Sequence, residues 1–242
     1  ETIKFSPKKL YDFIKMKAVL VSGTSIDFKI DKELITDSTP SYERFHFKNG
    51  IADYLDIKNK NSAKLFDKQF SIVKNINDNE KCEIFISFNQ NEKSSLISFC
   101  NTIETPDGGS HENGFKNGIL KAIKLYGQKN QVSKISNINI NDLTDYSDIV
   151  ISIFINEPSF EGQTKKRIIM PKLQKQLETT IQNEFLLWLN SNKKITKNLI
   201  DTLIERSLLR TDLTKIRELE RKSFKERHKL PGKLVDCSSK NI

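Results

Sequence analysis

Residues 96–126 read LISFCNTIETPDGGSHENGFKNGILKAIKLY, and this stretch decides the fold class. The β-branched and aromatic residues of Leu96–Ile103 predict a strand. Pro106–Gly109 breaks that pattern, and Ser110 is then a favoured residue for capping a helix. Apolar side chains follow at helical spacing as far as Tyr126. A strand that leads through a tight turn into an amphipathic helix indicates a mixed α/β (α+β) fold.

Hydrophobic periodicity predicts further helices and strands on both sides of this stretch. Upstream we expect a helix over 7–20, a short helix over 51–57, and strands over 25–30, 42–47, 66–73 and 83–88. A polar hairpin over 89–93 should join the last of these strands to the strand that starts at Leu96. Downstream we expect a strand over 148–156, a helix from about Pro171, and a longer helix from about Ile195 to beyond Phe224.

The composition argues against two classes of protein. The chain has 242 residues, of which 36% are hydrophobic and 29% charged, and its 15 Phe residues argue against wholesale disorder. No run approaches the roughly 18 uninterrupted apolar residues of a membrane-spanning helix, so we expect no membrane partner. The chain begins at Glu1 without an initiator Met or a cleavable signal, and we expect a fragment of a longer cytoplasmic protein.

The positive charge is concentrated near the C-terminus. The formal net charge is +9, and residues 192–233 carry 13 Lys and Arg against 6 Asp and Glu. Residues 1–191 are nearly balanced. Two interpretations stay open for the basic segment: a solvated helix face that keeps the protein soluble, or an electrostatic surface that binds nucleic acid through its phosphates.

The cysteines and histidines form no pattern that is typical of a disulfide framework or a metal site. They are few and widely spaced: Cys82, Cys100, Cys237, His46, His111 and His228. None of the thiols has a neighbourhood that argues for nucleophilic use, so we expect inert thiols in a reducing compartment. We predict no metal ligands in this chain.

Two segments are candidates for binding an anion. Gly108–His111 lies at a predicted helix start, where backbone N–H groups attract negative charge, although a tight turn into a capped helix is the favoured explanation. The loop Glu161–Arg167 places the side chains of Gln163 and Lys165 on one side if it is extended. A lysine so placed balances the charge of a transferred γ-phosphate, and an amide orients it. A polar surface loop remains the alternative.

Three stretches, in order, resemble the ATPase subunits of type IIA DNA topoisomerases. Asn101–Phe115 resembles their N-x-I-x-T-x-x-G-G-T-H-x-x-G-F/L segment, and Glu157–Lys165 resembles their E/D-P-x-F-x-G-Q-T-K loop. Leu230–Cys237, LPGKLVDC, resembles the LPGKLADC sequence before their cleavage-reunion half. The order and spacing fit across essentially the whole chain. Phe185–Asn190 and Cys100–Thr102 look more like the B subunit of topoisomerase IV than that of gyrase.

The resemblance implies a domain organisation. Residues 1–49 would be the incomplete end of a GHKL-type ATPase domain, and residues 50–229 a transducer domain. The transducer fold resembles a small-subunit ribosomal protein, has a left-handed βαβ crossover and ends in a long helix. Residues 230–242 would form a linker toward the cleavage-reunion (Toprim) domain. The family's catalytic Glu, magnesium-binding Asn and adenine site have no counterpart here, so the fragment alone is expected to be inactive.

The resemblance also implies a function for the parent protein. It would bind ATP and Mg²⁺, hydrolyse ATP and couple hydrolysis to passage of double-stranded DNA. Its partners would be the A subunit of topoisomerase IV (or of gyrase) and, on ATP binding, a second copy of the B subunit. Gln163 and Lys165 would contact the γ-phosphate, with Lys165 in the catalytic role. The alternatives are a non-enzymatic module that binds nucleic acid through its basic helix, or another GHKL ATPase such as a mismatch-repair protein.

Overall fold

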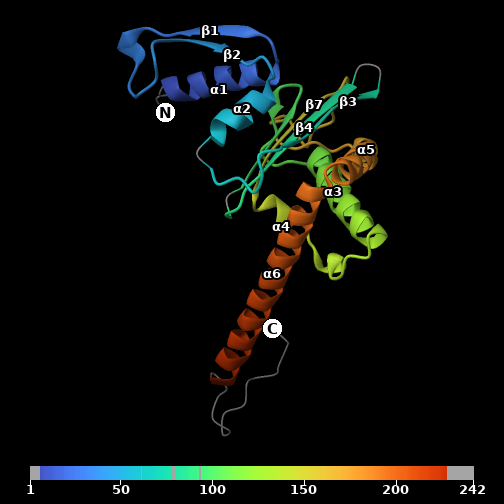
Figure 1. The fold of residues 1–242 in the computed structure, drawn as a ribbon. Helices are drawn as coiled ribbons and strands as arrows, with labels where there is room; N and C mark the ends of the chain where they lie inside the picture. Colours follow the sequence, from blue (N-terminus) through green and yellow to red (C-terminus); the bar gives the residue numbers. More distant parts are fainter. Residues whose placement is uncertain (1–5, 61, 78–79, 93, 228–242) are drawn as a thin grey trace, which may run out of the picture.

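The chain folds into a central mixed sheet with helices on one face and a smaller unit on the other (Figure 1). The computed structural model describes residues 6–227 apart from 61, 78–79 and 93. The Leu230–Cys237 motif, Cys237, His228 and the predicted linker therefore lie outside the described residues. Within the described part, no helix combines the length and the apolar character that crossing a membrane requires.

The N-terminal unit consists of α1, β1 and β2. Helix α1 (Pro7–Leu20) starts with a proline. The first position of a helix favours proline, because its N–H would have no partner within the helix. Strands β1 (Ser25–Lys29) and β2 (Tyr42–His46) pair antiparallel, with the one-turn η1 (Lys32–Leu34) between them. Helix α2 (Ile51–Lys58) then leads to the central sheet. The predictions for all four segments are confirmed, within one residue at each end.

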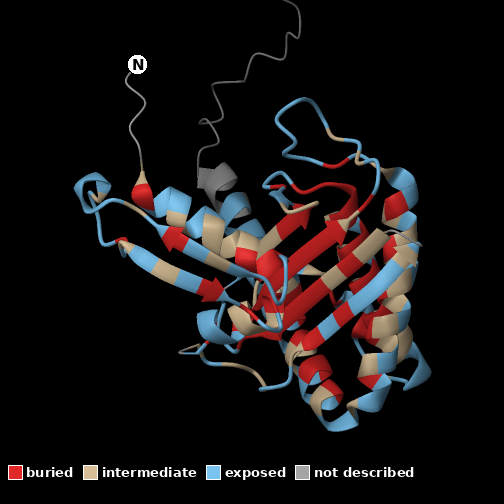
Figure 2. Cartoon of the chain, turned by 90° about the horizontal axis from the view of Figure 1, so that it is seen from above, coloured by how far each residue is buried: buried red, intermediate tan, exposed pale blue. Residues whose placement is uncertain are grey.

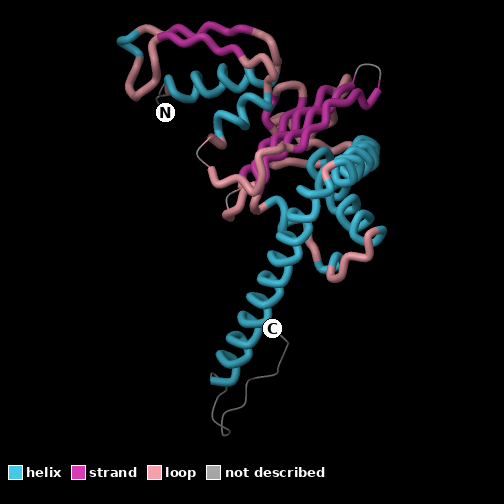
Figure 3. The backbone as a smooth tube through the Cα atoms, viewed as in Figure 1, coloured by secondary structure: helices cyan, strands magenta, loops and turns pink. Residues whose placement is uncertain are grey.

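The central sheet contains five strands in the order β3-β4-β7-β5-β6. Their bounds are β3 Phe70–Asn77, β4 Glu80–Phe88, β5 Ser95–Cys100, β6 Ile103–Glu104 and β7 Ser147–Phe154. Strand β5 runs parallel to β7, and the other neighbours are antiparallel. The connection between β5 and β7 passes through α3 (Ser110–Lys129), η2 (Ile135–Asn137) and α4 (Asn141–Thr144). In the tube drawing, the strands of this sheet lie between the N-terminal unit and helices α3 and α5 (Figure 3).

The predicted hairpin over 89–93 is wrong. Strands β4 and β5 are not neighbours, because β7 lies between them and pairs with both. Seven of the eight residues of β7 are buried, since apolar side chains on both of its faces favour the centre of the sheet. The polar segment crosses the start of this strand instead, where the Asn89 N–H donates to the Tyr146 carbonyl oxygen at 2.7 Å.

Three further expectations need correction. The strand predicted over 66–73 starts only at Phe70. The strand predicted over 96–103 ends at Cys100, because Asn101 and Thr102 adopt positive φ angles of 49° and 64° and reverse the chain into β6. Ser110 does not cap α3. It is the first residue of the helix, and its hydroxyl oxygen accepts a hydrogen bond from the Met170 N–H at 2.8 Å.

The sheet has an apolar core on each face (Figure 2). On one face, alternate residues of β4 and β7 pack against α3, α5 (Pro171–Ser191) and the start of α6 (Lys193–Arg227). On the other face, Phe85, Phe99 and Val150 pack with the inner end of α1 and with α2. The sheet therefore joins the N-terminal unit to the helical layer through a buried apolar cluster on each of its faces.

Helix α6 begins in the core and then leaves it. Leu199, Ile200 and Leu203 are buried, whereas Leu209 and Leu219 are 63% and 64% exposed. The part from Leu208 onward, called the stalk below, projects away from the N-terminal unit (Figure 1). The long helix predicted from Ile195 to beyond Phe224 is confirmed, but Leu209, Leu213, Ile216 and Leu219 in its outer part are exposed.

Candidate functional site

The loop between β7 and α5 has a fixed base. Phe160 and Ile168 face each other in an antiparallel bridge. The Glu161 N–H donates to the Arg167 carbonyl oxygen at 2.9 Å, and the Ile169 N–H donates to that of Ser159 at 2.9 Å. These bonds close the loop on itself, so that residues 161–167 form a short projecting arch.

A second set of bonds fixes the base of this loop to the turn before α3. The Ile168 N–H donates to the Gly108 carbonyl oxygen at 3.1 Å, and the Ser110 N–H donates back to the Ile168 carbonyl oxygen at 2.9 Å. Gly109 lies between them with φ of 127°, a conformation that favours glycine. A Cβ atom there would overlap the carbonyl oxygen of Ile168. Only glycine permits this approach of the two backbones.

These bonds decide between the two interpretations of Gly108–His111. The N–H of Ser110 is already paired with Ile168, and the N–H of Gly108 donates to the Thr105 carbonyl oxygen at 2.9 Å. The carboxylate of Glu112 lies against Gly108 and brings a negative charge to the same place. The favoured interpretation, a tight turn into a helix, is confirmed over the anion site.

The tip of the loop carries the predicted site residues. Gly162 and Lys165 have φ angles of 81° and 55°, and the Lys165 N–H lies 3.4 Å from the Gly162 carbonyl oxygen. The tip is therefore a compact turn, and the assumption of an extended loop is wrong. All residues from Glu161 to Arg167 are exposed. Within the described part of the chain, the side chains of Gln163 and Lys165 make no hydrogen bond or ion pair.

The Lys165 ammonium lies near an aromatic ring, and its charge acts on a buried thiol. Its Nζ atom lies 6.0 Å from the centroid of the Phe160 ring. Burial raises the pKa of the Cys100 thiol to about 12, against a smaller lowering by the positive charge of Lys165. The ammonium and the Gln163 amide therefore keep their N–H donors available for an anion that arrives from outside. The loop therefore has a hydrogen-bonded base and a tip with N–H donors that are available to an anion.

A buried polar cluster lies beneath the turn at the base of the loop. Nε2 of His111 lies 3.1 Å from Oγ1 of Thr105, which lies 2.7 Å from Oγ of Ser98. The Ser98 hydroxyl donates to Oε1 of Glu112 at 2.8 Å. The cluster cannot be recognised from local sequence patterns, because its members come from β5, the turn and α3. It places His111 as a packing residue rather than as a ligand.

The burial of His111 makes the stability of the protein depend on pH. Burial lowers its pKa to about 4, with a smaller effect of the Lys116 charge. Between pH 6.5 and pH 4 only the unfolded chain takes up this proton, so the free energy of unfolding falls as the pH falls. We expect wild type to lose about 2 kcal/mol more than His111→Gln between pH 7 and pH 4.5. Urea denaturation at both pH values measures this, and an equal loss in both proteins would contradict it.

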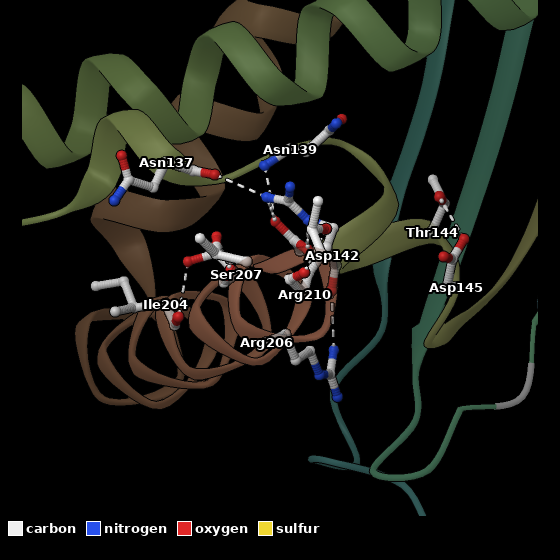
Figure 4. A network of polar contacts seen from close by, with 11 residues as sticks. Asn137, Asn139, Asp142, Thr144, Asp145, Ile204, Arg206, Ser207 and Arg210 are labelled. Carbon is white, nitrogen blue, oxygen red and sulfur yellow. Dashed lines mark hydrogen bonds and ion pairs between the residues drawn. The ribbon is translucent and has the colours of Figure 1, made fainter. Parts of the chain in front are cut away.

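The start of the stalk is fixed to α4 by a second polar network (Figure 4). Nε and Nη2 of Arg210 donate to the two carboxylate oxygens of Asp142 at 2.8 and 3.1 Å, and the Asn139 N–H also donates to this carboxylate. The Arg206 guanidinium lies 3.7 Å from the centroid of the Tyr146 ring and donates to the Asn89 carbonyl oxygen at 3.0 Å. Arg206 and Arg210, the first two arginines of the basic segment, thus make contacts within the protein.

The two described thiols lie in the core of the protein. Cys82 and Cys100 are free and buried, and burial raises the pKa of each to about 12, as expected for inert thiols. Among the residues that the structure describes, no three His, Cys, Asp or Glu side chains gather as metal ligands. The loop tip is the feature of the described chain that is best suited to bind an anion.

The sequence is similar to that of known proteins over most of its length. The sequence pattern of the family described as DNA gyrase B matches residues 50–219. The B subunit of DNA topoisomerase 4 from Rickettsia felis is 35% identical over 240 residues, which cover 98% of this chain and 36% of that protein. The chain thus spans about a third of the length of this relative. It belongs to the DNA gyrase B family and is part of a type IIA topoisomerase B subunit.

Two solved structures share the fold. The ATP-binding domain of topoisomerase IV of Francisella tularensis, in complex with a small-molecule inhibitor, is 28% identical with a TM-score of 0.71, and the match covers 87% of this chain and 56% of that one. The 43K ATPase domain of Thermus thermophilus gyrase B, in complex with an aminocoumarin, is 24% identical with a TM-score of 0.72, covering 90% and 57%. The mixed α/β architecture is therefore that of gyrase B ATPase regions.

Proposed function

We propose that this chain couples ATP hydrolysis to DNA strand passage in the B subunit of topoisomerase IV. Residues 1–49 are the end of its GHKL ATPase domain, residues 50–229 its transducer domain and residues 230–242 a linker to the Toprim domain. The start of the family match at residue 50 supports this division. The parallel neighbours β5 and β7, joined through α3, supply the crossover, which we take to be left-handed as in the family. The topoisomerase 4 relative supports the choice of subfamily.

The observation that carries the proposal is the loop tip with its unpaired donors. In the parent protein, ATP and Mg²⁺ bind largely to residues upstream of this chain. Lys165 then approaches the γ-phosphate from outside and stabilises the negative charge that develops on it, while Gln163 orients the phosphate. The fixed base of the loop keeps the entropy lost on this contact small, since only the tip needs to become ordered.

The stalk then carries the movement of the loop toward the DNA. The loop leads directly into α5, and α5 leads into α6, so a movement at the tip reaches the stalk through packed helices. Closure of two B subunits around ATP would then reorient both stalks, which lead toward the A subunit and the DNA. Lys215, Arg217 and Arg221 of the stalk are exposed and suit contact with the phosphates of double-stranded DNA.

A variant that loosens the stalk tests this coupling. In the full-length B subunit mixed with the A subunit, we expect Arg210→Met to lower the DNA relaxed per ATP hydrolysed about tenfold, because the charged hydrogen bonds to Asp142 are lost. ATP turnover itself should stay within about twofold, since Arg210 does not contact the loop. Plasmid relaxation and phosphate release, measured in the same reaction, give both quantities.

Lys215→Met is the matched control. It removes the same charge from the same helix, but Lys215 is exposed and makes only a surface ion pair with Asp212 at 3.4 Å. Relaxation and ATP turnover that fall in parallel in Arg210→Met would contradict a coupling role. Relaxation at the same rate without added ATP would contradict the coupling of ATP hydrolysis to strand passage.

A further inference from the structure

A lysine at the end of α1 reaches across to the edge of the central sheet. Nζ of Lys17 donates to the carbonyl oxygen of Thr102 at 2.5 Å and to its Oγ1 at 2.9 Å. The two residues are 85 positions apart in the sequence, and they belong to the N-terminal unit and to the β5–β6 turn. Burial lowers the pKa of Lys17, so its ammonium is partly removed from water and depends on these two acceptors.

The turn that Lys17 contacts is itself attached to the start of the loop. Nδ2 of Asn101 donates to the Ile155 carbonyl oxygen at 2.9 Å, and the Ile155 N–H donates to Oδ1 of Asn101 at 2.9 Å. The Asn101 N–H also donates to the Ile153 carbonyl oxygen at 2.9 Å. Because Asn101 and Thr102 both hold positive φ angles, their conformation depends on such contacts. The loop that carries Gln163 and Lys165 begins just after Ile155.

The surroundings of the contact allow movement. A cavity of about 550 Å³ lies between α1 and the β5–β6 edge. It is lined mainly by apolar side chains from both sides: Phe13, Met16, Leu20, Ile97, Phe99 and Ile103. A closely packed interface would hold α1 in one position, whereas a cavity of this size leaves its outer part free to shift. Among the described residues, the hydrogen bonds that join α1 to the turn both come from Lys17.

We propose that Lys17 is a positioning residue that transmits the orientation of the N-terminal unit to the loop of Gln163 and Lys165. A shift of α1 displaces the Thr102 turn through the ammonium, and Asn101 passes this displacement to Ile155. The inference rests on the proposed function of the loop. Lys17 contacts Thr102 and not the loop itself, so its effect is on the placement of the loop.

Hydrogen exchange in the full-length protein tests the chain of contacts without using activity. We expect the Ile155 amide to exchange about tenfold faster in Lys17→Met than in wild type, because its acceptor Asn101 loses its fixed position. Lys17→Arg, which keeps a donating cation, should restore most of the protection. Lys9→Met is the matched control, since Lys9 lines the same cavity from the same helix and is exposed. Equal exchange in Lys17→Met and Lys9→Met would overturn the inference.

ATP turnover tests whether Lys17 acts through the loop. In the full-length protein we expect Lys17→Met to lower kcat about tenfold and to leave KM for ATP within about twofold. In a Lys165→Ala background, Lys17→Met should cause no further loss, because both act on one step. Independent, multiplying losses would overturn the inference. If Lys165→Ala keeps full turnover, the proposed function of the loop fails, and the Ile155 exchange still decides whether Lys17 holds the loop.

Discussion

Replacing Lys165 with alanine in the full-length protein should lower kcat for DNA-stimulated ATP hydrolysis by about 10²–10³-fold. A preorganised donor aimed at developing charge typically contributes this much, and the ammonium of Lys165 has no competing ion pair within the described chain. Steady-state phosphate release at saturating ATP measures the change. The thermal stability of the protein should stay the same, because the side chain is exposed at the tip of the loop.

The neighbouring lysine provides the control for this substitution. Lys166 carries the same charge in the same loop, and the Asp107 N–H donates to its backbone carbonyl oxygen, a bond that does not involve the side chain. We expect Lys166→Ala to retain turnover within about threefold. Equal rates for Lys165→Ala and wild type would make the tip an ordinary surface loop and leave DNA binding by the stalk as the better account.

Replacing Gly109 with alanine should destabilise the protein by about 3–5 kcal/mol. The added Cβ would overlap the Ile168 carbonyl oxygen and lie 2.7 Å from the Ile168 nitrogen, and both are backbone atoms that have no room to move aside. The substitution also forces a φ of 127° on a residue with a side chain. The overlap can be removed only if the hydrogen bonds between the turn and the base of the loop break. Urea denaturation measures the loss of stability.

Gly162→Ala is the control that distinguishes the cost of a strained backbone from the cost of the atomic overlap at Gly109. Gly162 also has a positive φ, of 81°, but no atom lies within 4 Å of a Cβ built there. We expect it to lower the free energy of unfolding by only about 1 kcal/mol. If Gly109→Ala were no more destabilising than Gly162→Ala, the close approach of the turn to Ile168 would not hold the base of the loop.

Local sequence patterns predicted the helices and strands that are decided by neighbouring residues. The helix over 7–20 follows from a proline at its start and regular apolar spacing, and both signals lie within the segment itself. The pairing of β4 with β7 instead of β5 could not be predicted in this way. It depends on a strand about 60 residues downstream, whose apolar residues on both faces place it at the centre of the sheet.

The candidate site shows the same division. The position of Gln163 and Lys165 in a polar loop follows from the sequence and from its resemblance to a family. The contacts that hold the loop do not follow from the sequence, because their partners are distant along the chain. Gly109 and Ile168 are about 60 residues apart, and Lys17 and Thr102 are 85 apart. The premise of an extended loop failed for a local reason, since Gly162 and Lys165 adopt left-handed angles that close the tip into a turn.

The central claim is that the loop tip contacts the γ-phosphate, and hydrogen exchange of residues 161–167 in the full-length protein tests it most directly. With a non-hydrolysable ATP analogue, we expect these amides to exchange at least about tenfold more slowly than with ADP, because only the analogue offers the phosphate that orders the tip. This protection should disappear in Lys165→Ala. Equal exchange with the analogue and with ADP in the wild-type protein would contradict the account.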